Sequence, residues 1–179
     1  TLRQAASITG TTSQTNVACN GGTNGSTSVT VAGGAGGYTY SWAPSGGTAA
    51  TATGLAAGTY TCTITDANNC QITKNFTISQ PTAINFTTTI LSGYDYNTGY
   101  NQTIVTSGGT GSKTYAVTAG SLPAGFSLST AGQITGISTQ ITDSNFMVTV
   151  TDDNSCTATY NYVLKLNQIP ITVTATPSQ

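Results

Sequence analysis

Apolar and polar residues alternate along several short segments of this 179-residue chain. Residues 26–34, 59–66 and 146–152 each place apolar side chains at every second position, and in the second segment Tyr60 and Ile64 alternate with threonines. A period of two is that of a β-strand with one buried face. Short strands separated by Gly, Asn and Asp turns are typical of two packed antiparallel sheets. The pattern predicts an all-β chain made of tandem Ig-like β-sandwich domains.

The chain also contains an internal repeat. Three pairs of segments correspond in sequence: 58–78 with 144–164, 33–42 with 108–117, and 79–89 with 167–177. The first pair matches Asp66 with Asp152 and Cys70 with Cys156. The repeat therefore predicts three units, at 1–80, at 81–167, and at 168–179 as the first strand of a further repeat.

The glycine cluster of residues 33–37 (GGAGG) is compatible with a phosphate-binding loop or with a turn between strands. A phosphate loop lies between a strand and a helix and is typically followed by Lys and Ser or Thr. Here the next residues, Tyr38, Tyr40 and Trp42, alternate as in a strand. The equivalent glycines within 108–111 have the same place in the second repeat. We therefore interpret both clusters as turns.

Composition narrows the possible partners. Only 5% of the residues are charged, the net charge is −1, and the four cations are scattered. Nucleic-acid binding needs clustered Lys and Arg, so none is expected. No apolar run approaches the ~20 residues of a membrane span, so membrane insertion is not expected. The chain lacks a signal peptide and does not begin with Met, so we expect an excerpt of a longer chain.

The acidic residues offer little for catalysis. The chain has no His and no Glu, and its five Asp residues occur mostly in predicted turns. A catalytic dyad or triad needs a base beside a nucleophile, or a metal. Asp152, Asp153 and Asn154 lie close enough in sequence to bind calcium, but the same residue types are typical of turns. We predict that the protein is not an enzyme, and calcium remains a weaker alternative to a turn at 152–154.

Two groups of aromatic residues are candidate ligand contacts. Trp42 shares one face of its predicted strand with two tyrosines, either as core or as an exposed surface that stacks on sugar rings. Tyr94, Tyr96 and Tyr100 lie in a Gly- and Asn-containing loop, and loops often carry binding residues. Both groups are consistent with a carbohydrate-binding module, which would leave the rings exposed in a line.

Residues 19–70 resemble the SprB-type repeat of large surface adhesins from gliding Bacteroidetes. The motifs that carry the likeness are Cys-Asn-Gly-Gly at 19–22, Tyr-Thr-Tyr-Ser-Trp at 38–42, Gly-Leu-x-x-Gly-Thr-Tyr at 54–60 and Thr-Asp-Ala-Asn-x-Cys at 65–70. Residues 121–138 (SLPAGFSLSTAGQITGIS) instead resemble the putative-Ig repeat of bacterial surface proteins. That second unit lacks the Cys-Asn-Gly-Gly start, so it departs from the SprB pattern.

Together the two resemblances imply a stalk segment of a secreted cell-surface adhesin that is exported by the type IX system. The partners that they imply are the neighbouring repeats of the same chain. Surface polysaccharides are the partner class of the carbohydrate-binding alternative. A third hypothesis is a filament subunit in which residues 168–179 complete a neighbour's sheet by strand addition. No cofactor is expected, and the implied location is extracellular.

Four cysteines are consistent with an oxidising compartment and allow three pairings if two bridges form. The SprB-type resemblance implies Cys19–Cys70, because the repeat carries a cysteine at both positions. Cys62 alternates with Tyr60 and Ile64, so we expect it to be a buried thiol, and Cys156 has no counterpart of Cys19 in its own unit. The expectation is one bridge and two thiols.

Overall fold

The computed structural model describes residues 7–167, which form two compact units that divide between Ala83 and Ile84. The boundary lies three residues after the predicted one at 80/81. The predicted strand at 168–179 lies outside the described residues. Within 7–167 every regular element is a strand, and no helix there is long and apolar enough to cross a membrane.

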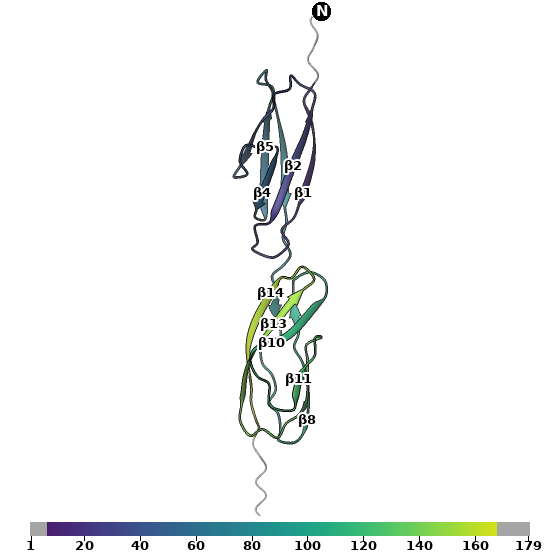
Figure 1. Cartoon of the computed structure of the whole chain (residues 1–179), viewed down its shortest axis with the longest axis vertical. Helices are drawn as coiled ribbons and strands as arrows, with labels where there is room; N and C mark the ends of the chain where they lie inside the picture. Colours follow the sequence, from purple (N-terminus) through teal and green to yellow (C-terminus); the bar gives the residue numbers. More distant parts are fainter. Residues whose placement is uncertain (1–6, 168–179) are drawn as a thin grey trace, which may run out of the picture. The chain divides into compact units, whose positions relative to one another are not determined.

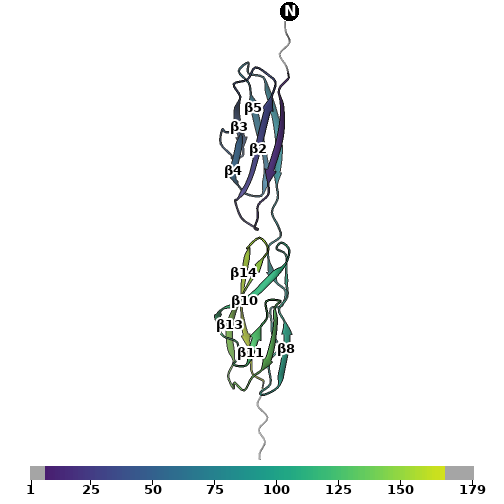
Figure 2. The same ribbon diagram turned by 45° about the vertical axis from the view of Figure 1, so that its right-hand side comes forward.

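Domain 1 is a sandwich of two three-stranded antiparallel sheets (Figures 1 and 2). Its strands are β1 (Thr9–Thr15), β2 (Gly25–Ala32), β3 (Thr39–Ala43), β4 (Thr51–Leu55), β5 (Gly58–Thr65) and β6 (Gln71–Ile78). One sheet has the order β1-β2-β4 and the other β3-β5-β6. The period-two pattern is realised on β5, where Tyr60, Cys62 and Ile64 are buried and the threonines between them are partly exposed.

The core of domain 1 lies between these two sheets. Its buried residues include Val29 from one sheet and Trp42, Ile64 and Phe76 from the other. The Trp42 and Phe76 rings lie 5.3 Å apart, and the Trp42 indole Nε1 donates a hydrogen bond to the Ala49 carbonyl at 2.8 Å. The domain therefore buries its only tryptophan with the polar atom satisfied, as a stable core requires.

Domain 2 is also an all-β sandwich, with more and shorter strands. They are β7 (Asn85–Phe86), β8 (Gly99–Thr103), β9 (Thr106–Ser107), β10 (Lys113–Gly120), β11 (Phe126–Leu128), β12 (Gln133–Ile137), β13 (Ser144–Asp152) and β14 (Thr157–Leu164). They form the sheets β10-β13-β14 and β11-β12-β8, with a two-stranded β7-β9 pair. The pairing of β10 with β13 contains an irregularity between Val117 and Ala119.

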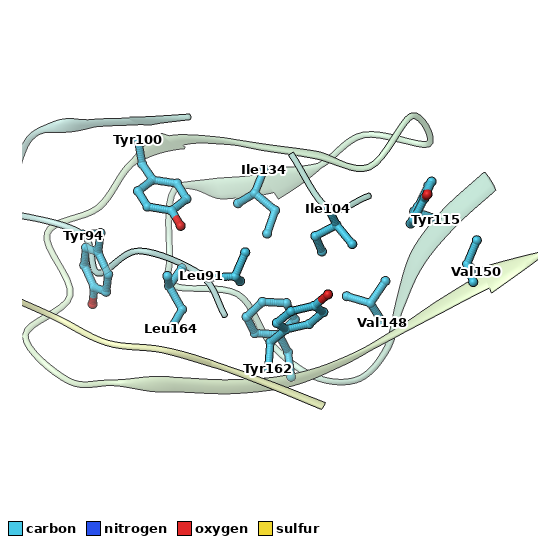
Figure 3. Close-up of a cluster of buried hydrophobic side chains, with 11 residues drawn as sticks. Leu91, Tyr94, Tyr100, Ile104, Tyr115, Ile134, Val148, Val150, Tyr162 and Leu164 are labelled. Atoms are coloured by element: carbon cyan, nitrogen blue, oxygen red, sulfur yellow. The ribbon is translucent and has the colours of Figure 1, made fainter. Parts of the chain in front are cut away.

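The core of domain 2 is rich in aromatic side chains (Figure 3). In this view the rings of Tyr94, Tyr100 and Tyr162 point in among aliphatic residues such as Ile134 and Leu164. The tyrosine hydroxyls still have acceptors; for example, that of Tyr162 donates to a backbone carbonyl. Burial raises the pKa of Tyr162, so this phenol stays neutral as a core residue must. The prediction of an all-β, Ig-like sandwich fold is confirmed in both units.

Candidate functional site

The glycine cluster of domain 1 is a turn held by one aspartate. Asp66 lies in the turn between β5 and β6 and is almost fully buried. Its Oδ2 accepts a hydrogen bond from the Ala35 backbone N–H at 2.9 Å, and its Oδ1 accepts from the N–H groups of Asn68 and Cys70, each at 2.9 Å. The Asp66 carboxylate thus joins the glycine loop to the last hairpin of the domain.

Domain 2 repeats this arrangement atom for atom. Asp152 Oδ2 accepts from the Thr110 N–H at 2.8 Å, and its Oδ1 accepts from the N–H groups of Asn154 and Cys156, each at 2.9 Å. Thr110 is the residue that the sequence repeat matches with Ala35. The sequence alignment therefore predicted two equivalent turns, and we call each of them an aspartate-held turn.

The glycines in these turns are required by close packing as well as by backbone conformation. Gly34 and Gly109 both have positive φ, of 61° and 68°. A Cβ on Gly34 would lie 2.8 Å from Asp66 Oδ2, and one on Gly109 would lie 3.0 Å from Asp152 Oδ2. A side chain there would push the carboxylate off its donors. Two features of the motif, the glycines and the aspartate, thus serve one structural purpose.

The aspartate-held turns lower the pKa of both carboxyls. For Asp66 the largest cause is the Ala35 N–H; burial opposes it, and the N–H groups of Cys70 and Asn68 lower the pKa further. For Asp152 the Thr110 N–H is the largest cause, with the same opposition from burial. The charged form of each carboxyl is therefore the one that the fold stabilises.

A pH dependence follows from these lowered pKa values. Both lie below the usual 3.8, so the stabilisation is present above that pH and is lost as the pH falls through the folded-state pKa. We expect thermal melting temperatures to fall as the pH is lowered from ~4 toward ~2. The double variant Asp66→Asn/Asp152→Asn should melt lower at neutral pH and change less on acidification. Asp95→Asn is the control, and a double variant as acid-sensitive as the parent chain would contradict this explanation.

Calcium binding at residues 152–154 gains no support from the described residues. Both oxygens of Asp152 are already bonded to backbone N–H groups, and Asp153 Oδ2 accepts from the Ser112 N–H at 2.9 Å. Within 7–167 no group of three His, Cys, Asp or Glu side chains could hold a metal ion. The Asp152 carboxylate therefore belongs to the turn, and calcium at this position remains an untested prediction.

Trp42 is not available as a ligand contact. Its side chain is 7% exposed, and it packs in the core of domain 1 beside Phe76. The tyrosines that alternate with it, Tyr38 and Tyr40, also pack against this core. The proposed stacking surface on this strand is therefore wrong, because the aromatic side of β3 is the side that faces the opposite sheet.

The tyrosines of residues 94–100 separate into core and surface. Tyr94 is 1% exposed and Tyr100 8%, so neither can stack on a ligand, and that part of the prediction is also wrong. The Tyr94 hydroxyl donates to the carbonyls of Gln140 and Thr142, which allows a phenol to be buried in this loop. Tyr96 is 42% exposed and remains the one predicted contact residue on the surface.

The cysteine pairing implied by the SprB-type resemblance is wrong. Cys19 and Cys156 are disulfide-bonded, whereas Cys70 is an exposed free thiol. The reason lies within domain 1: Cys70 directly precedes β6, but the loop that holds Cys19 is bonded to the other end of that strand, through Val17 N to Ser79 O at 2.9 Å. Eight strand residues span about 26 Å, far more than the ~7 Å limit between the Cα atoms of a disulfide.

The second free cysteine, Cys62, is fully buried on β5, as the alternation predicted. Burial raises the pKa of its thiol, so little of the reactive thiolate forms at neutral pH. Alkylation of the native, unreduced protein should therefore label Cys70 alone. Unfolding without reductant should expose Cys62 as a second labelled thiol. Labelling of Cys19 in the unreduced chain, detected by peptide mass mapping, would contradict this assignment.

A surface groove of about 540 Å³ lies between the edge strands β1 and β6 of domain 1. Its lining combines Ile8 and Ile72 with the polar residues Thr9, Gln71, Thr73 and Lys74. Lys74 is the single charged residue among them. Among the described residues that line the groove, no two titratable side chains could exchange a proton, and proton exchange is what a general acid–base site needs.

Family comparisons agree with this architecture. Residues 11–48 match the family described as "SprB repeat", and residues 77–167, just over half of the chain, match the family described as "Putative Ig domain". The chain therefore belongs to the Putative Ig domain family and carries a SprB repeat before it. Together these families define a repeat segment of the surface-adhesin type. No curated protein sequence matches the chain.

Several solved structures are similar to the chain at low sequence identity. The titin domains I67–I69 match with a TM-score of 0.49 and 16% identity, over 90% of this chain and 66% of that one. An intimin fragment solved with the intimin-binding domain of its translocated receptor matches with a TM-score of 0.44 and 17% identity, over 92% of this chain and 65% of that one. Sidekick-1 immunoglobulin domains 1–5 match with a TM-score of 0.43 and 11% identity, over 93% of this chain and 40% of that one. The chain thus spans well under two thirds of the Sidekick-1 fragment.

Proposed function

We propose that the chain is a non-catalytic spacer in the stalk of a large, secreted bacterial cell-surface adhesin. The observation that carries this proposal is the placement of the aromatic residues. Trp42, Tyr94 and Tyr100, which a carbohydrate-binding surface would expose, lie in the two cores with their polar atoms hydrogen-bonded. Residues with this role stabilise a fold and contact no ligand.

The sequence motifs support the same function. The glycine clusters and their aspartates, the most recognisable features of the repeat, form the aspartate-held turns. A unit whose motif residues maintain its own fold suits a repeat whose task is length and spacing. The SprB repeat supports a surface adhesin. From the same likeness we propose a role in gliding motility and export by the type IX system.

The low charge of the chain fits such a spacer. Outward positions on the strands carry mainly hydroxyl groups; for example, Thr118 and Thr149 bond to each other at 2.7 Å across β10 and β13. The ion pair of Lys165 and Asp143, at 3.9 Å, joins two well-exposed side chains. A neutral, hydroxyl-rich surface remains hydrated and does not attract charged polymers over long range.

A carbohydrate-binding module remains the second candidate, and Tyr96 is the observation that favours it. Its side chain is 42% exposed in a loop that also contains Asn97 at a φ of 54°. A single exposed ring offers one stacking contact, whereas polysaccharide binding uses several. The filament alternative depends on residues 168–179, which lie outside the described part of the chain.

A replacement experiment tests the spacer. The chain is inserted between a bacterial surface anchor and a binding domain of known specificity, and capture of cells by an immobilised receptor is measured. We expect an unrelated tandem of two Ig-like domains to substitute for it without loss of capture, because a spacer contributes length alone. Capture that requires residues 1–179, or that occurs without the added binding domain, would contradict the proposal.

A further inference from the structure

Cys70 and Cys156 occupy the same position in the two aspartate-held turns. Each backbone N–H donates to Oδ1 of the turn aspartate at 2.9 Å. The preceding residues, Asn69 and Ser155, both have a φ of 62°. Equal hydrogen bonds and equal backbone conformation place the two cysteines equivalently in their domains. Cys156 is disulfide-bonded, whereas Cys70 is an exposed thiol.

Cys70 has no possible disulfide partner within its own domain. Cys19 is tied to the far end of β6, where the Gly21 N–H also donates to Gln80 Oε1 at 2.7 Å. Cys62 is paired in register with Lys74 on β6, four residues beyond Cys70 and about 13 Å away along the strand. Its side chain is also fully enclosed in the core. Any disulfide of Cys70 must therefore reach another domain.

We propose that Cys70 is a disulfide-forming site whose partner is a cysteine of the Cys19 type on another copy of this repeat. The repeat carries its two motif cysteines at opposite ends of β6, so they cannot pair with each other. In an array joined end to end, one end of each repeat faces the opposite end of the next. The motif then supplies one cysteine for each junction from either side, and the disulfides join successive repeats.

The disulfide-bonded state of Cys156 is the independent support for this inference, because it shows that the turn position takes a disulfide in this chain. The inference also depends on the proposed array of repeats. A covalent link at each junction would carry pulling force from one repeat to the next. Such links would help a stalk to resist being pulled apart.

A low-molecular-weight disulfide can serve as the oxidant that joins Cys70 to its partner cysteine. The Cys70 thiolate attacks that disulfide, which forms a mixed disulfide and releases one small thiol. The thiolate of the partner cysteine then attacks the Cys70 sulfur and releases the second small thiol. The two protein thiols lose two electrons and two protons in total, and the small disulfide becomes two thiols.

The test uses two full-length variants that each retain one of the two thiols. Cys70→Ser/Cys156→Ser leaves Cys19 free, and Cys19→Ser/Cys156→Ser leaves Cys70 free; both keep the buried Cys62. The variants differ by a mass tag and are mixed in equal amounts in a glutathione redox buffer. Non-reducing electrophoresis and peptide mass mapping then measure the Cys19–Cys70 heterodimer against the two homodimers. Thermal melting establishes that both variants are folded.

We compare the squared concentration of the heterodimer with the product of the two homodimer concentrations. We expect this ratio to exceed its value for random pairing about tenfold, which is equivalent to a preference of ~1.4 kcal/mol for the heterodimer. The same mixture in denaturant should return to random pairing. A matched control, Cys19→Ser/Cys156→Ser/Cys70→Ser/Asn68→Cys, moves the thiol by two residues within the same exposed turn and should also pair at random. Random pairing by the folded variants would overturn the inference, whereas the capture experiment above judges the spacer function separately.

Discussion

Trp42→Ala is expected to lower the free energy of unfolding of domain 1 by about 3–5 kcal/mol, the usual cost of truncating a buried large aromatic residue. Trp42 fills the space beside Phe76 at a ring distance of 5.3 Å. Removing the indole leaves a cavity between the two sheets and leaves the Ala49 carbonyl without its donor at 2.8 Å. Urea unfolding followed by circular dichroism measures the change.

Trp42→Phe is the matched control for this prediction. It keeps an aromatic ring in the core but loses the indole N–H, so it should cost clearly less than the alanine variant. The unfolding of domain 2 should be unaffected in both variants, because its core has separate residues. If Trp42→Ala left the stability of domain 1 unchanged and abolished only the binding of a glycan, Trp42 would be a ligand contact and this prediction would be wrong.

Tyr94→Ala is expected to destabilise domain 2 by a similar ~3–5 kcal/mol. Tyr94 is among the most deeply buried large side chains of the described residues, and its ring meets Phe126 edge-on at 5.3 Å. Its hydroxyl also donates to the Thr142 carbonyl at 2.9 Å, which fixes the loop before β13. The substitution therefore removes packing and a buried hydrogen bond together.

The neighbouring tyrosine gives a sharp control for Tyr94→Ala. Tyr96 is two residues away, has the same side chain and is 42% exposed. Tyr96→Ala should change the unfolding free energy of domain 2 by less than about 0.5 kcal/mol, as for most surface substitutions. Equal effects of the two substitutions would show that residues 94–100 do not divide into core and surface as described.

Much of the fold follows from local sequence patterns. Alternation on residues 59–66 predicts the buried face of β5, and the internal repeat matches Asp66 with Asp152, which accept equivalent hydrogen bonds. The interpretation of the glycine clusters as turns also agrees with the structure. These features are predictable because strand period and turn chemistry depend on residues close together in the chain.

The features that sequence could not predict depend on contacts between distant residues. The Asp66 carboxylate accepts from the N–H of Ala35, which is 31 residues away, and nothing in either segment alone indicates this bond. Tyr94 lies in a segment with the composition of a surface loop, yet acceptors on residues 140 and 142 allow its burial. For Trp42, alternation identified one face of a strand but could not decide whether that face points inward.

The cysteines show the same limit. Cys19 and Cys70 both belong to the recognised motif, so a bridge between them was the natural interpretation of the sequence. Their positions at opposite ends of β6 become visible only when the loop after β1 is tied to Ser79 and Gln80. Sequence spacing gives the length of a closed loop but not the distance between its ends in the fold.

The most direct test of the spacer function is binding of the folded 1–179 protein to a panel of glycans and polysaccharides. Tyr96→Ala removes the exposed ring, and Ile137→Ala is a control at another exposed apolar residue of domain 2. We predict no saturable binding by the parent chain at concentrations where its melting transition shows that it is folded. Saturable binding that is lost in Tyr96→Ala and retained in Ile137→Ala would contradict the spacer and identify a carbohydrate-binding module.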